Sequence, residues 1–124
     1  MIKCGDTFLL EDEDGYNQHL CIVVTPPTED KVAVVSVTTR RSRSEILVVL
    51  KAGDHPSIDH ESVIAYTYSR VVETEYIENA VKNRDAARRD SVSPQLLDRA
   101  QKGLLESEFT PYGVLDFYKK ATKI

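Results

Sequence analysis

Five short runs rich in valine, isoleucine and leucine dominate the first half of this chain of 124 residues. They cover residues 7–10, 20–25, 32–38, 46–50 and 62–66. Stretches rich in Gly, Pro, Asp and Ser separate the runs, and no interval holds a helical crossover of the kind that parallel strands require. The pattern therefore predicts an antiparallel meander with the strand spacing of a small barrel or sandwich.

The pattern changes after the fifth run. Residues 73–89 are polar and only weakly periodic, which fits either a frayed helix or a loop that carries Ile77, Ala80 and Val81 inward. The sequence does not decide between a helix and a loop for this segment.

Two helix starts follow. Ser93 and Pro94 form a typical N-cap and first-turn pair, and apolar residues then recur at helical spacing, which predicts a helix over 94–106. A Thr-Pro pair at 110–111 repeats the signal and predicts a short last helix. We therefore expect an α+β fold, mainly β with C-terminal helices.

Length and composition favour one globular unit. With 41% hydrophobic and 29% charged residues, the chain is neither disordered nor fibrous, and 124 residues are enough for one apolar core. We expect a single domain over 1–124, with a barrel region over 1–72 and a mostly helical extension over 73–124. The first apolar run is broken by acids before a secretory segment or a membrane span could form, so we expect a cytoplasmic protein.

Charge and cysteine usage restrict the function classes. A net charge of −4 disfavours a protein that holds nucleic acid by a generally basic surface, so any RNA contact must be local. Cys4 and Cys21 form no Cys-x-x-Cys pair, and neither a zinc site nor a disulfide framework is expected. Acids cluster in 11–14 and arginines in 40–43, and each block by itself is typical of a solvated loop.

The common catalytic motifs are missing from the sequence. The glycines are scattered and form no phosphate-binding loop, so the sequence predicts no nucleotide cofactor. No Ser lies in a hydrolase motif. The pairs Asp54-His55 and Asp59-His60 match no standard metal site and fit polar turns better. We expect no metal and no cofactor.

Polar residues mark the ends of two strand runs. His19 opens the second run, and Thr38 and Thr39 close the third before Arg40. In an antiparallel barrel such strand ends can converge on one rim, where side chains reach a ligand. A lone histidine at a strand edge is, however, more often a surface residue or a hydrogen-bonded core residue than a catalyst.

Four segments in this order resemble the MazF/PemK toxins. They are Gly5-Asp6-Thr7-Phe8, the run from His19 to Pro26, Thr38-Thr39 with Val48-Val49-Leu50, and Glu61-Ser62-Val63-Ile64-Ala65. The resemblance covers roughly residues 3–72. It implies an SH3-like barrel, a homodimer, a cognate antitoxin protein as partner, and metal-independent cleavage of single-stranded RNA to a 2′,3′-cyclic phosphate.

The resemblance also implies a site. Thr38 matches the family's active-site threonine, whereas His19 falls where the family has its catalytic arginine. We take His19 and Thr38 as candidate catalytic residues. The candidate substrate-binding residues are Thr39, Arg40, Arg43, His55, His60 and Arg70.

The change at His19 leaves alternatives open. An imidazole, with an ordinary pKa of about 6.5, can exchange a proton near neutral pH, whereas arginine supplies a fixed charge and a bidentate fork. His19 is then either a general acid or base assisted by nearby arginines, or the mark of a protein without nuclease activity. The acids at 11–14 would repel phosphate. The alternative functions are a barrel-fold binding module or toxin that inhibits a protein target such as gyrase, and a structural or regulatory domain.

Overall fold

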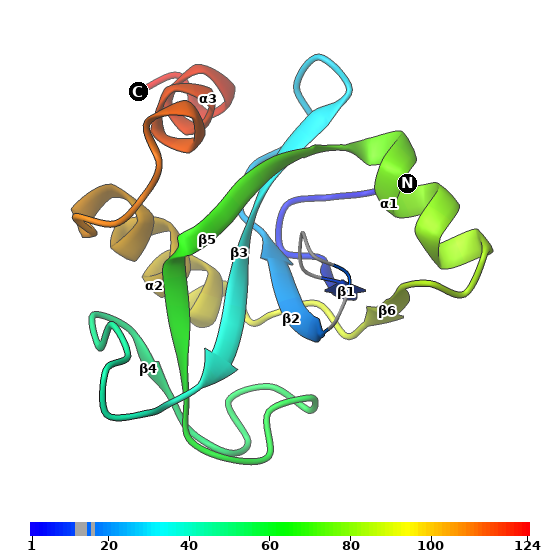
Figure 1. Ribbon diagram of the computed structural model, residues 1–124. Helices are drawn as coiled ribbons and strands as arrows, with labels where there is room; N and C mark the ends of the chain where they lie inside the picture. Colours follow the sequence, from blue (N-terminus) through cyan, green and yellow to red (C-terminus); the bar gives the residue numbers. More distant parts are fainter. Residues whose placement is uncertain (12–14, 16) are drawn as a thin grey trace.

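A curved antiparallel sheet forms the centre of the protein, and helices cover both of its faces (Figure 1). The computed structural model describes residues 1–11, 15 and 17–124, so residues 12–14 of the acidic block lie outside the described part. The strands are β1 (Thr7–Glu11), β2 (Gln18–Val23), β3 (Lys31–Thr39), β4 (Val49–Leu50), β5 (Ser62–Glu73) and β6 (Ala87–Arg89). The helices are α1 (Thr74–Lys82), α2 (Pro94–Glu106) and α3 (Tyr112–Thr122).

The sheet has the strand order β4-β5-β3-β2-β1-β6, and every pair whose register is defined is antiparallel. β1, β2 and β3 are consecutive neighbours, as a meander requires. The sheet runs from β4 at one edge to β6 at the other and curves into a half-barrel. The predicted α+β fold, mainly β with C-terminal helices, is confirmed.

Both faces of the central strands are buried. Along β3, Ala33, Val35 and Val37 belong to a core shared with α2 and α3, whereas Val32 and Val34 belong to a second core shared with β1 and α1. A strand buried on both faces has a continuous apolar run instead of alternation, because its two sets of side chains both leave water. This explains why the run 32–37 is apolar at almost every position.

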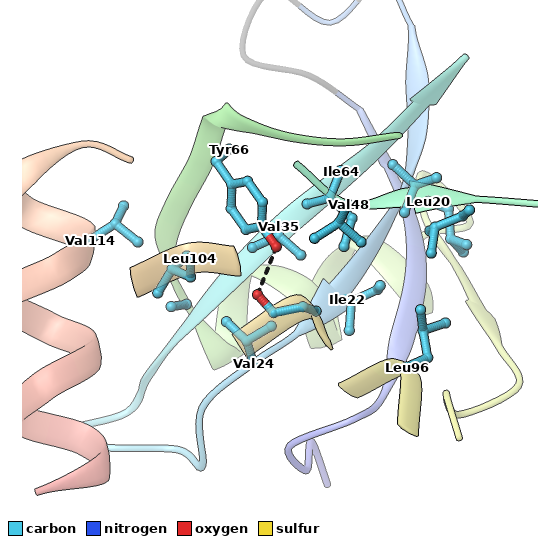
Figure 2. Packing of buried hydrophobic residues seen from close by; sticks show 14 of the residues in the cluster. Leu20, Ile22, Val24, Val35, Val48, Ile64, Tyr66, Leu96, Leu104 and Val114 are labelled. Atoms are coloured by element: carbon cyan, nitrogen blue, oxygen red, sulfur yellow. Dashed lines mark hydrogen bonds between the residues drawn. The ribbon is translucent and has the colours of Figure 1, made fainter. Parts of the chain in front are cut away.

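A hydrogen bond between Tyr66 of β5 and α2 fixes this helix against the sheet (Figure 2). The Tyr66 side chain is fully buried, and its hydroxyl donates a hydrogen bond of 2.8 Å to the carbonyl oxygen of Ala100. Burial raises the pKa of the Tyr66 phenol above its ordinary value, so the hydroxyl stays protonated and able to donate. A Cβ added at Gly103 would lie 2.1 Å from the Tyr66 hydroxyl oxygen, so this helical glycine is required for the close approach.

An irregularity bends the long strand β5. Val34 pairs with Arg70 and Ser36 pairs with Ala65, so the four residues 66–69 stand opposite the single residue Val35. Such extra residues bend a strand and turn their side chains away from the regular pleat. The bend lies beside the surface where the polar strand ends meet.

Asp6 connects the N-terminal segment to the chain before α2. Its buried carboxylate accepts hydrogen bonds from the Lys3 backbone N–H, the Arg88 guanidinium and the Ser91 hydroxyl. Burial alone would raise the pKa of Asp6, but these three donors outweigh it and hold that pKa below its ordinary value. The Gly-Asp pair near the N-terminus therefore has a structural role.

The predicted elements agree with the structure to different degrees. The helix over 94–106 is confirmed, with the Ser93 hydroxyl accepting from the Leu96 N–H, and the last helix is confirmed but longer than expected. The run at 46–50 is a strand only at Val49–Leu50, because Ile46 and Leu47 are exposed. The open segment 73–89 contains a regular helix, α1, and a strand, β6, that pairs with β1.

No helix in the described ranges is both long enough and apolar enough to cross a membrane.

Candidate functional site

A row of polar side chains continues one of the two apolar cores. On β3, the face that carries Val32 and Val34 continues with Ser36 and Thr38, and the burial falls from complete to partial along it. On β2, Val23 on the same face is followed toward the strand start by Cys21 and His19. The apolar face beside α1 therefore ends in hydroxyl, thiol and imidazole groups.

The strand register places His19 beside Thr38. Cys21 pairs with Ser36 and Leu20 with Val37, and this antiparallel register leads on toward His19 and Thr38 at the ends of the two strands. The Cys21 sulfur lies 3.8 Å from the Ser36 hydroxyl, which shows that side chains on this face meet across the two strands. Side chains opposite one another on one face of an antiparallel pair are neighbours.

The first of two grooves on this surface has a volume of about 1080 Å³. His19 and Thr38 line it together with the basic residues Lys31 and Arg70. α3 contributes the apolar residues Val114 and Phe117, and the acids Glu11 and Glu29 also line the groove. The groove therefore combines an imidazole and a hydroxyl with both cations and anions.

The second groove, of about 920 Å³, extends from the same point toward β4 and the loops beside it. Thr39, Arg41, Arg43 and His60 line it. Of the residues that the structure describes, the two grooves share five lining residues, Asn17, His19, Thr38, Thr67 and Tyr68. His19 and Thr38 thus lie where the two grooves join.

Tyr68 stands at the same junction as an exposed aromatic ring. It belongs to the irregular stretch 66–69 of β5, and 66% of its surface is accessible. An exposed tyrosine beside a groove provides a flat surface on which a nucleic-acid base can stack.

The Arg70 guanidinium reaches across to β1. It donates a hydrogen bond of 2.8 Å to the Glu11 carbonyl oxygen at the end of that strand. This bond uses one of the five N–H donors that an arginine side chain carries, and Arg70 also lines the first groove.

His60 has a partner on each ring nitrogen. Nδ1 lies 2.5 Å from an Asp59 carboxylate oxygen, and Nε2 lies 2.8 Å from the Thr39 hydroxyl. His60 and Thr39 are exposed and both line the second groove. Thr39, His60 and Arg43 are therefore brought to the surface that holds His19 and Thr38.

Arg40 is directed elsewhere. Its guanidinium forms an ion pair with Glu61 at 2.5 Å, and its backbone N–H donates to the Glu61 carbonyl oxygen. Among the described residues it lines a third, smaller hollow and neither of the two grooves.

His55, which was expected to bind substrate, lies apart from the two grooves. Only 2% of its surface is exposed, and in the described part of the chain it lines neither groove. Its Nδ1 accepts from the Ser57 N–H, so Nε2 carries the proton and donates to the Asp90 carbonyl oxygen. His55 thereby joins the β4–β5 connection to the segment before α2.

Comparison with known proteins gives a structural likeness only. No protein-family model and no curated protein sequence matches the chain. Two crystal structures of MazE-MazF from Deinococcus radiodurans, Form-II and Form-III, each hold a similar chain, with TM-scores of 0.55 and 0.56. Each match has 14% sequence identity and covers 95% of that chain and 86% or 85% of the present one.

The chain has a MazF-like fold. The likeness extends over most of the chain, so it includes the helical part as well as the sheet. At this low identity the comparison shows the fold alone, and the roles of His19 and Thr38 depend on the geometry of the grooves.

Three residues that line the first groove were not predicted from the sequence, namely Tyr68, Lys31 and Ser36. Tyr68 follows the apolar run 62–66, and the strand irregularity that exposes it has no local signal. Lys31 is a strand-end lysine like many others. Ser36 interrupts the apolar run 32–37, and this interruption was a usable signal that the face becomes polar there.

Proposed function

We propose that this protein is the toxin of a type II toxin–antitoxin system and cleaves single-stranded RNA without a metal ion. The observation that carries the proposal is the placement of His19 and Thr38 on one sheet face, at the junction of two grooves that basic residues line. A MazF-like fold supports the same class of function.

The reaction needs few parts. The ribose 2′-hydroxyl attacks the adjacent phosphorus, the bond to the 5′-oxygen of the next nucleotide breaks, and a 2′,3′-cyclic phosphate and a 5′-hydroxyl remain. Proton transfer requires a general acid and a general base, and the phosphoryl oxygens require hydrogen-bond donors or cations. In the proposed site His19 transfers a proton, the Thr38 hydroxyl donates to a phosphoryl oxygen, and Arg70 and Lys31 attract the phosphate.

The RNA would follow the joined grooves past the exposed Tyr68 ring. Stacking on an aromatic ring is tolerant of base identity and contributes about 1–3 kcal/mol per base. Because the net charge of the protein is −4, we expect the attraction for RNA to be local and to depend on the basic residues that line the grooves, Arg41 and Arg43 among them.

A metal-free cleavage assay tests the proposal. Purified protein is incubated with mixed-sequence single-stranded RNA in an excess of chelator, and the fragment ends are analysed chemically. We expect fragments with a 2′,3′-cyclic phosphate and a 5′-hydroxyl. Intact RNA, or fragments that carry a 5′-phosphate, would contradict the proposed reaction.

The acidic lining favours a second candidate function, a binding module that acts on a protein target. Glu11 and Glu29 line the first groove and would repel RNA phosphate. The same two acids would attract a basic segment of a protein target. The same assay separates the two functions, because a binding module leaves every RNA intact.

The partner proposed for either function is an antitoxin protein, with the toxin itself a homodimer. The proposal follows the similar chains, whose structures are described as MazE-MazF. Phe109 and Tyr112, in and beside the connection between α2 and α3, are 57% and 86% exposed and provide apolar surface for a protein contact.

A further inference from the structure

Three linked side chains are not used by the reaction above, and two of them, Thr39 and His60, line the second groove. The Asp59 carboxylate lies 2.5 Å from Nδ1 of His60, and Nε2 of His60 lies 2.8 Å from the Thr39 hydroxyl oxygen. Thr39 belongs to the end of β3, next to Thr38, whereas Asp59 and His60 belong to the segment before β5. The tertiary fold therefore brings a carboxylate, an imidazole and a hydroxyl into one line.

The two contacts determine which nitrogen holds the proton in the neutral ring. The hydrogen bond from His60 holds the pKa of Asp59 below its ordinary value, so Asp59 is an ionised carboxylate that can only accept. Nδ1 of His60 therefore carries the proton, and Nε2 presents a lone pair to the Thr39 hydroxyl. A hydroxyl that donates to this lone pair makes the same contact as a ribose 2′-hydroxyl makes with a general base.

We propose that His60 is the second proton-transfer residue of this site, with Nε2 accepting the proton of the ribose 2′-hydroxyl while His19 protonates the leaving oxygen. The proposal rests on the proposed ribonuclease function and deepens it. His60 and His19 both line the second groove, and the proposal takes one RNA backbone to contact both. Asp59 is a positioning residue that orients the ring and fixes its tautomer.

The step balances without a metal or a cofactor. The 2′-oxygen forms a bond to phosphorus, and its proton moves to Nε2 of His60. The bond from phosphorus to the 5′-oxygen breaks, and that oxygen takes a proton from the imidazolium of His19. One histidine gains a proton and the other loses one, and exchange with water restores both before the next turnover.

The groove surrounds His60 with further charged and titratable groups. Those lining it are His19, Arg41, Arg43, Glu45 and Tyr68, and the Arg40–Glu61 ion pair adjoins it in the sequence. The two arginines place positive charge where the phosphate would bind. Because all of these groups contribute to the pH dependence, the test compares variants of one residue at a time.

The test is the pH profile of cleavage of an end-labelled, mixed-sequence single-stranded RNA in chelator. The proteins are the wild type, His60→Ala, Asp59→Asn, His19→Ala and the control Asp116→Asn. Asp116 is an exposed aspartate of α3 that lines neither groove, so the control makes the same chemical change at a distance from the site. Thermal unfolding of each variant checks that its fold is retained.

We expect a bell-shaped profile for the wild type, in which the acid limb reports the base and the alkaline limb reports the acid. His60→Ala should lower the rate by about a hundredfold or more and remove the acid limb. Asp59→Asn should slow cleavage but keep the acid limb, because the base is still present and only its orientation and tautomer are less well fixed. Asp116→Asn should match the wild type.

Two results would overturn the role of His60 and leave the ribonuclease function standing, one from the cleavage assay and one from NMR. If His60→Ala and Asp59→Asn cleave like the wild type while His19→Ala is slow, His60 has no role and the ribonuclease function stands. If the wild type cleaves no RNA, the ribonuclease function and the role of His60 fail together. Nitrogen NMR of the free protein is independent of activity, and a neutral His60 ring that is protonated at Nε2 instead of Nδ1 would also overturn the proposal.

Discussion

At the scale of single residues, two similar dipeptides differ in burial. Asp54-His55 and Asp59-His60 look alike in the sequence, yet His55 is buried with both ring nitrogens bonded within the fold, whereas His60 is exposed in a groove. Local sequence cannot separate them, because the difference is set by the distant residues Asp90 and Thr39 that they meet.

Thr38 gives a direct test of the proposed phosphate contact. Thr38→Val keeps the shape and the β-branching of the side chain but removes its hydroxyl, so the fold should be retained. We expect the turnover of single-stranded RNA to fall by about a hundredfold, the usual scale for one donor to a developing charge. Turnover equal to that of the wild type, with the same unfolding temperature, would remove Thr38 from the mechanism.

Asp6 should make the protein sensitive to acid. Its pKa in the folded protein lies below the ordinary value of 3.8, so its hydrogen bonds stabilise the fold above that pH. This stabilisation is lost as the pH falls from there through the folded-state pKa. We expect Asp6→Asn to lower the free energy of unfolding near neutral pH by on the order of 1–3 kcal/mol. Urea unfolding measures this difference from the wild type, which should shrink toward pH 3.

The exposed Asp116 again provides the control for this substitution. Asp116→Asn should leave the urea midpoint nearly unchanged at every pH, because exposed charges contribute little. A difference between Asp6→Asn and the wild type that grows toward low pH would contradict the account of Asp6.

At the scale of elements, replacing a glycine of α2 or of α3 by alanine should change the stability in opposite directions. A Cβ at Gly103 would collide with Tyr66 and Val48, so Gly103→Ala should destabilise the fold by about 1–3 kcal/mol despite the better helix propensity of alanine. A Cβ at Gly113, also helical, meets no described atom within 4 Å, so Gly113→Ala should be neutral or stabilising by up to about 1 kcal/mol. Chemical denaturation of both variants measures the contrast, and equal effects would contradict the packing described here.

The elements that were predictable carry local signals. The cap at Ser93, the helical stripe after it and the apolar runs at 7–10 and 32–38 are readable because each depends on neighbouring residues. β6 and the irregular stretch 66–69 are not, since the first is a strand only through its pairing with β1 and the second only through its register with β3. The candidate site was predictable at His19 and Thr38, and Tyr68 was missed because the irregular stretch exposes it.

At the scale of the whole molecule, we predict a homodimer in solution. The chain has a mass of 14.0 kDa and exposes large apolar side chains such as Phe109 and Tyr112, which favour burial against a second copy. Light scattering over a wide concentration range should give twice the mass of one chain. A single species of 14.0 kDa at every concentration would contradict the prediction.

The central claim is that the junction of the two grooves cleaves RNA by proton transfer at His19. Its most direct test compares the metal-free cleavage rate of wild type, His19→Ala and His19→Arg on the same single-stranded RNA across pH. We expect the wild-type rate to fall at alkaline pH, where a general acid at His19 loses its proton, and His19→Ala to be slower by about a hundredfold or more. His19→Arg should lose that alkaline limb, because an arginine side chain does not release its proton there. Equal cleavage by wild type and His19→Ala at every pH would contradict the claim.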